Sequence, residues 1–286
     1  MFWNQFKTVI LLTSLSSVLV LFGFWVGGTN GIYFALILSL LMNFLTYFFS
    51  DKLVLSMYGA QKLDEEQYSH IYDMIHELSM EMHIPMPKLW YLPTSMANAF
   101  ATGRNPKHGS VAVTQGILDI LDVHELRGVL AHELSHIKNR DILVATIAAT
   151  IATAIGFLAN MVKWAAIFGG SSDREKSNGG VLGALVAAII MPLAAMLIQL
   201  AISRSREYLA DETGAEACKD PLALASALER LHFSAQNQHL EPESTAQASV
   251  ASLFIVYPFS ASGLIALFST HPPMEKRIAK LRAMAK

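Results

Sequence analysis

The sequence predicts a mainly α-helical membrane protein, with four transmembrane helices and a compact α+β part outside the bilayer. Hydrophobic residues make up 53% of the 286 residues and charged residues only 15%, an unusual balance for a soluble protein. Four stretches without Asp, Glu, Lys or Arg come close to or exceed the roughly 20 apolar residues that cross a bilayer. They are residues 9–26, 32–49, 142–162 and 181–202. The alternative, four buried helices of a soluble enzyme, requires unusually long uncharged core segments.

The distribution of positive charge predicts which side of the membrane the polar parts occupy. The connection 27–31 has no Lys or Arg, whereas Lys7 and Lys52 flank the first pair of spans. By the positive-inside rule the amino terminus is then cytoplasmic. The second connection, 163–180, carries three basic residues and weakens the rule locally. The first apolar stretch is interpreted as a retained span, because it is longer than a usual signal peptide core and lacks a clear cleavage site.

This topology divides the chain into four parts. Residues 1–50 form a transmembrane hairpin, 51–141 a first cytoplasmic part, 142–202 a second hairpin, and 203–286 a second cytoplasmic part. The net charge of −2 gives no indication of nucleic-acid binding, and the single cysteine, Cys218, excludes an intramolecular disulfide.

Periodicity then predicts the elements of the cytoplasmic parts. Apolar residues at helical spacing indicate a helix over 64–82, and a second helix from 123 to 137 that leads almost directly into the third span. Short strands are expected at 88–92 and 109–114. Further helices are expected at 203–218, 221–233 and 274–284. The apolar stretch 251–268 contains Pro258 and Gly263, and we interpret it as core rather than a fifth span.

The second of these helices carries His132-Glu133-Leu134-Ser135-His136, an H-E-x-x-H motif. Positions i and i+4 lie on one face of a helix, so both imidazoles can bind one metal ion. Glu133 can then take a proton from a metal-bound water. Chance or an inert helix face can also produce this pattern, so the motif needs further support.

A catalytic zinc site needs a third protein ligand. No histidine follows at the spacing known from other H-E-x-x-H enzymes, and the best candidate is Glu207, just after the fourth span. Antiparallel third and fourth spans would bring Glu207 close to the motif. Asp211, one turn further on, can accept a hydrogen bond from a ligand imidazole. The alternative is a solvated acidic helix face.

Taken together, these motifs resemble the M48 family of integral-membrane zinc peptidases, and the four-span layout resembles its bacterial HtpX-type (heat-shock) branch. Further matching segments run along nearly the whole chain: Phe48-Phe49-Ser50-Asp51-Lys52, Met57-Tyr58-Gly59-Ala60, Asn98-Ala99-Phe100-Ala101-Thr102-Gly103, and Thr270-His271-Pro272-Pro273 with Arg277-Ile278.

The resemblance implies a gluzincin-like, cytoplasm-facing endopeptidase of the bacterial inner membrane that cleaves misfolded or damaged membrane proteins in quality control. It further implies one Zn²⁺ per chain on His132, His136 and Glu207, with Glu133 as catalytic base. Its partners would be polypeptide substrates and the bilayer; the sequence leaves the oligomeric state open.

Some roles remain open at this stage. Asn98 and Ala99 either pair with the substrate backbone or form a simple turn. His271, Arg204 and Arg206 are candidates for stabilising the oxyanion, or else are structural. Two rival functions also remain: a prenyl-protein (CAAX-type) peptidase, and a non-enzymatic membrane sensor or scaffold that binds the same metal.

Overall fold

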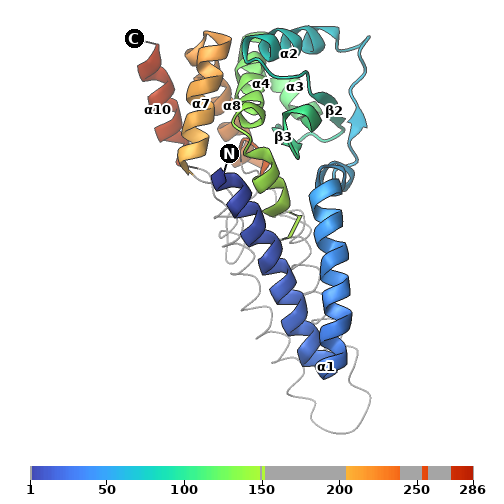
Figure 1. Ribbon diagram of the computed structural model, residues 1–286. Coiled ribbons are helices and arrows are strands. Elements are labelled where there is room, and N and C mark those ends of the chain that lie inside the picture. The colour runs from blue at the N-terminus through green and yellow to red at the C-terminus, as the bar shows by residue number, and fades with distance from the viewer. Residues whose placement is uncertain (1, 149, 152–203, 239–252, 257–271, 286) are drawn as a thin grey trace.

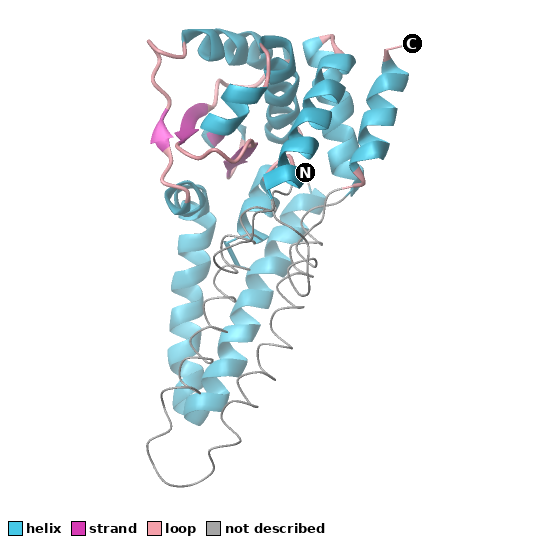
Figure 2. Cartoon of the chain, turned by 180° about the vertical axis from the view of Figure 1, so that it is seen from behind, coloured by secondary structure: helices cyan, strands magenta, loops and turns pink. Residues whose placement is uncertain are grey.

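A computed structural model of the protein describes residues 2–148, 150–151, 204–238, 253–256 and 272–285. A long helical hairpin extends from a compact part made of helices and a small sheet (Figure 1). Turned by 180°, the same arrangement shows the strands at the junction of the compact part with one arm of the hairpin (Figure 2). The prediction of a mainly helical chain with a small α+β part is therefore confirmed.

The hairpin is formed by α1 (Phe2–Met57), which changes direction at Gly28. Gly28 has φ 56°, a conformation that is easy for glycine and strained for most other residues. The reversal thus falls within the predicted connection 27–31. The second arm, Gly28–Met57, is long and apolar enough to cross a membrane, and only 17% of its apolar window is buried. The first arm contains a shorter apolar helix, Phe6–Leu21.

The second predicted hairpin is described only at its start. Residues 142–148 and 150–151 are helical, as expected for the beginning of the third span. The rest of this span and the whole of the fourth, up to residue 202, lie outside the described residues.

The small sheet has four strands in the order β1-β2-β4-β3, so β3 lies at an edge. Strands β2 and β4 match the predicted strands and run parallel to each other, whereas β3 is antiparallel to β4. All five residues of β3 are buried. Its sequence, Ala-Phe-Ala-Thr-Gly, lacks the β-branched residues at alternate positions that indicated β4. The strands are β1 (Gln61–Lys62), β2 (Lys88–Leu92), β3 (Ala99–Gly103) and β4 (Gly109–Thr114).

Helices pack around this sheet and around one central helix, α4. The predicted helix ends hold for α7 and α10, while α8 extends beyond residue 233. Helix α2 starts later than predicted, because the Asp64 side chain accepts a hydrogen bond from the Gln67 amide (2.8 Å) and stabilises a turn before it. The helices are α2 (Ser69–Glu81), α3 (Gln115–Ile120), α4 (Val123–Lys138), α7 (Arg204–Cys218), α8 (Pro221–Gln238) and α10 (Met274–Met284).

Helix α4 is held in the centre by its cap and by two close helix contacts. Asp122 and Glu125 form a reciprocal capping box at its start. Gly128 lets the α8 backbone approach, and Gly214 of α7 lies directly against the α4 backbone: an added Cβ at Gly214 would lie 2.8 Å from the amide nitrogen of His132. The absence of a side chain at residue 214 therefore sets the distance between α7 and the metal-binding motif.

Candidate metal centre and active site

Three side chains from α4 and α7 converge on one point. Nε2 of His132 lies 3.2 Å from Nε2 of His136, and the carboxylate oxygens of Glu207 lie 3.8 and 3.7 Å from these two nitrogens. The three ligand atoms all lie within 4.8 Å of one another. Ligands at about 2.1 Å from a tetrahedral zinc ion are themselves about 3.4 Å apart, so these three donors fit zinc and leave its fourth position to water or substrate.

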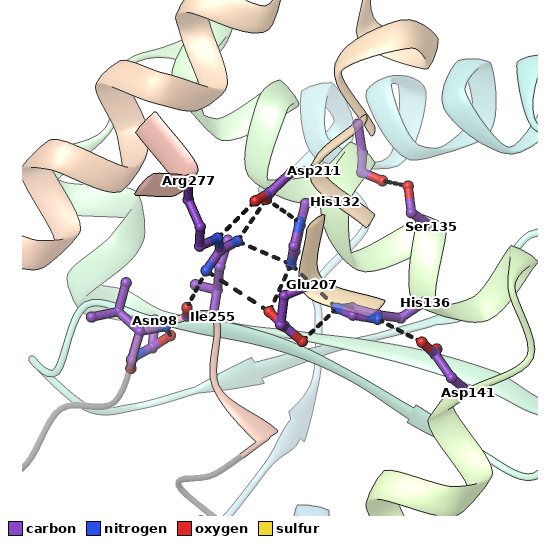
Figure 3. Close-up of polar contacts among 11 residues, drawn as sticks. Asn98, His132, Ser135, His136, Asp141, Glu207, Asp211, Ile255 and Arg277 are labelled. Carbon is purple, nitrogen blue, oxygen red and sulfur yellow. Dashed lines mark hydrogen bonds and ion pairs between the residues drawn. The ribbon is translucent and has the colours of Figure 1, made fainter. Parts of the chain in front are cut away.

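Each imidazole is oriented through its other nitrogen (Figure 3). Nδ1 of His132 lies 2.9 Å from the Asp211 carboxylate, and Nδ1 of His136 lies 3.3 Å from that of Asp141. Both Nε2 atoms are thereby left to face Glu207, which is the arrangement that carboxylate partners give to zinc-binding histidines. The sequence predicted Asp211 in this place. It missed Asp141, which a chain reversal at Arg140 (φ 57°) brings back to His136.

Arg277 of α10 is a residue of the site whose role was not predicted from the sequence. Its side chain is fully buried and binds Asp211 through two nitrogens, Nε (2.8 Å) and Nη2 (2.7 Å). It also lies 3.8 Å from Glu207. The carboxyl-terminal helix therefore supplies the positive charge that compensates two buried carboxylates (Figure 3).

A signal for this role exists in the sequence. Met274, Arg277 and Leu281 are the buried residues of α10 and recur at helical spacing, so the arginine lies on the apolar stripe of its helix. This pattern is difficult to recognise because Lys276 and Lys280, which are exposed, are also basic. The composition of the helix therefore suggests a solvent-exposed basic helix.

Burial has a large influence on the charges of the site. It lowers the pKa of His132, which favours the neutral imidazole that a metal requires. It raises the pKa of Glu133 to about 8. At His136 burial acts in the same direction as at His132, but the carboxylates of Asp141 and Glu207 outweigh it and raise the pKa to about 10. A bound dication would reverse both of these increases, because it stabilises ionised carboxylates and neutral imidazoles.

Glu133 and the three converging side chains face one small cavity of about 40 Å³. Glu133 is 2% exposed and accepts a hydrogen bond from the backbone amide of Ala101 in β3. A volume of this size holds a few water molecules at most and excludes a peptide chain. Among the described residues, the other wall residues are Ala101, Asp141, Ile142, Ala145, Arg206, Leu253, Phe254 and Ile255.

The remaining predicted site residues have different outcomes. Asn98 is buried; its side-chain nitrogen donates a hydrogen bond to the Val256 carbonyl, and its side-chain oxygen accepts one from the Val256 amide. Arg206 lies in the cavity wall, and its Nη2 has no hydrogen-bond partner within the described part of the chain. His271 lies outside the described residues, and for Arg204 only the backbone is described.

Comparison with known proteins assigns the class. The model of peptidase family M48 matches residues 65–285, and the chain therefore belongs to this family of metallopeptidases. A chain of the same fold is found in the crystal structure of S. mikatae Ste24p, with a TM-score of 0.52. At 16% identity this likeness concerns the fold alone; it covers 98% of the present chain and 66% of the Ste24p chain.

Within the family, the chain is similar to bacterial proteins named protease HtpX homolog. It is 53% identical to the one from Syntrophobacter fumaroxidans over 98% of its length and 99% of the relative. The one from Persephonella marina is 50% identical, over 99% of this chain and 98% of the relative. This chain is accordingly an M48 zinc metallopeptidase of HtpX type and a membrane protein.

Gly214→Ala provides a test of how α7 positions Glu207. The added methyl would meet the α4 backbone, and overpacking of this kind costs about 1–3 kcal/mol. We expect α7 to move away from α4 and the affinity for zinc to fall, as measured by competition with a chromogenic chelator. Gly128→Ala is the matched control, because it also adds a methyl group against a helix backbone, but at the contact of α4 with α8, and leaves the contact of α4 with α7 unchanged. Equal zinc affinity in both variants would contradict this role of Gly214.

Proposed function

We propose that this protein is a membrane-embedded zinc endopeptidase that cleaves misfolded or damaged membrane proteins in protein quality control. The observation that carries the proposal is the cavity itself. It combines two oriented imidazoles and one carboxylate, which suit a single zinc ion, with a further carboxylate, Glu133, that has no place in the ligand set.

The chemistry follows from these positions. Zinc held by His132, His136 and Glu207 would supply Lewis acidity, which lowers the pKa of water and polarises a peptide carbonyl. Glu133 takes a proton from the attacking water and passes it to the leaving amine. Arg206 offers positive charge to the oxyanion from the cavity wall. None of these steps needs a covalent nucleophile, so Cys218 has no task in them.

The location proposed is the bacterial cytoplasmic membrane, with several spans and the active site on the cytoplasmic side. The apolar arm Gly28–Met57 and the charge bias of its flanks support this orientation. In it, residues 169–180 lie outside. Cysteines introduced there, in a Cys218→Ser background, should react with a membrane-impermeant maleimide in intact cells, whereas a cysteine at exposed Glu66 should not. The opposite labelling pattern would reverse the orientation.

Two rivals make different predictions. A prenyl-protein peptidase requires a prenylated substrate, and this role is associated with more than four spans and a large intramembrane chamber. A metal-binding sensor accounts for the three ligands but gives Glu133 no task. Cleavage of an unmodified, unfolded protein separates the proposed endopeptidase from both rivals.

Removal of the metal tests the proposal directly. The protein is purified in detergent, zinc is added last, and cleavage of casein is followed. We expect cleavage to cease with a chelator and to return with one Zn²⁺ per chain, because the three ligands form a single site. Cleavage that persists without metal would contradict the proposal, and one bound zinc without cleavage would favour the sensor.

A further inference from the structure

The edge of β3 that pairs with no other strand is contacted by a short segment of the same chain, residues 253–256, which we call the edge segment. Strand β3 ends the sheet, and its other side pairs with β4. The Ile255 amide donates a hydrogen bond to the Ala99 carbonyl (3.1 Å), and the Val256 amide donates one to the Asn98 side chain (3.3 Å). The contacts of 255 with 99 and of 256 with 98 run in opposite directions along the two segments, although only the first joins two backbones and the edge segment is bent and not a strand.

This edge is also the one that faces the cavity. Backbone groups of alternate residues in a strand point the same way, and the Ala101 amide on this edge binds Glu133. Leu253, Phe254 and Ile255 form part of the cavity wall. The edge segment therefore lies where an extended peptide would have to lie to bring a carbonyl to Glu133 by pairing with β3.

The edge segment is anchored at two further points. The Phe254 ring is fully buried and stacks on Phe100 (5.3 Å between ring centres) and against Tyr58 (5.2 Å). The Ile255 carbonyl accepts a hydrogen bond from Nη1 of Arg277 (3.2 Å). The same guanidinium binds Asp211, so the edge segment is connected to the metal-binding group through one side chain.

We propose that the edge segment occupies the peptide-binding edge of β3 as an intramolecular competitor, which a substrate must displace. The inference rests on the proposed endopeptidase function. With the edge segment in place the cavity of about 40 Å³ excludes a peptide. The apparent affinity for a peptide is then reduced by the fraction of molecules in which the edge is free. A folded protein offers no extended chain that can compete for the edge of β3, and it is therefore not cleaved.

Loosening the edge segment tests the proposal. Ile255→Pro removes the amide that binds Ala99 and keeps the carbonyl that binds Arg277, while Phe254→Leu removes the ring contacts. The substrate is a fluorogenic peptide taken from a casein site that the parent protein cleaves. We expect Ile255→Pro to raise kcat/KM about fivefold through a lower KM, the factor that the loss of one net hydrogen bond gives. Phe254→Leu should change kcat/KM in the same direction, by about two- to tenfold, because the loss of an aromatic pair weakens the anchoring. Should Ile255→Pro fail to fold, Phe254→Leu decides.

Leu78→Ala is the control for general loosening, since Leu78 is fully buried on α2, away from the cavity wall. It should lower the melting temperature and leave kcat/KM unchanged. A purely structural edge segment predicts an unchanged or higher KM in the edge variants, and this result would overturn the inference. Failure of the parent protein to cleave casein with zinc bound would instead refute the proposed function, so the two failures are distinguishable.

Hydrogen exchange gives a second measurement. In zinc-loaded Glu133→Gln, saturating amounts of the same peptide should accelerate amide exchange in residues 253–256, because the peptide takes their place on β3. Unchanged or greater protection of these amides on peptide binding would contradict the displacement.

Discussion

Glu133→Gln is expected to retain one zinc per chain and to lose casein cleavage by a factor of about 10²–10⁴, the usual contribution of a general base. The amide keeps the shape of the side chain but cannot accept the proton of the attacking water. Glu133 is absent from the group of three converging ligand atoms, so the zinc content should not change. Zinc stoichiometry and the cleavage rate, measured on one preparation, check both parts.

Loss of folding is not expected to explain this result. Burial raises the pKa of Glu133 to about 8, above its ordinary value of 4.5. Between these two pH values the unfolded chain has lost the proton that the folded, metal-free chain still holds, so this group reduces stability as the pH rises. Glutamine does not ionise, so this decrease in stability is absent from the variant. At pH 7 the metal-free variant should therefore be at least as stable as the parent.

Glu125→Gln is the matched control for Glu133→Gln. Glu125 is buried on the same helix, where its carboxylate accepts hydrogen bonds from the Asp122 amide (3.1 Å) and the Ser226 hydroxyl (2.6 Å). Its substitution should lower stability and keep zinc-dependent cleavage. If Glu133→Gln cleaves casein as fast as the parent, Glu133 is not the base and the proposed mechanism is wrong.

Arg277→Met is expected to produce the largest loss of stability, about 3–5 kcal/mol, because it leaves a buried carboxylate without its counter-charge. The substitution would remove the two hydrogen bonds that Arg277 donates to Asp211. These bonds hold the Asp211 carboxylate in position next to His132. We therefore also expect zinc affinity to fall about 10–100-fold, as it does when partners of ligand histidines are removed. Chemical denaturation and chelator competition measure the two effects.

Two further variants separate charge from shape. Arg282→Met, on the same helix, removes an exposed partner of Glu229 and should change stability by less than about 1 kcal/mol. Adding Asp211→Asn to Arg277→Met removes the uncompensated charge, so part of the stability should return while zinc affinity stays low. Equal stability of Arg277→Met and Arg282→Met would show that the buried ion pair does not support the fold.

The local features of this protein could be predicted from its amino-acid sequence. Helical spacing placed His132 and His136 on one face of α4, and Glu207 and Asp211 one turn apart on α7, because i and i+4 positions follow from helix geometry alone. The prediction that Glu207 meets the two histidines came instead from the expected antiparallel course of the third and fourth spans. The apolar arms around Gly28 and the strands at 88–92 and 109–114 were likewise readable from composition and alternation.

Which groups distant in the sequence come into contact depends on the packing of the whole fold. Arg277 and Asp141 became part of the site, because burial and a chain reversal brought them to side chains that no local pattern connects with them. In the same way, Asn98 and Ala99 carry the expected backbone-pairing groups, but the fold turns residues 253–256 of the chain onto them. A backbone donor pairs with whichever acceptor the packing brings near, and amino-acid type does not encode that choice.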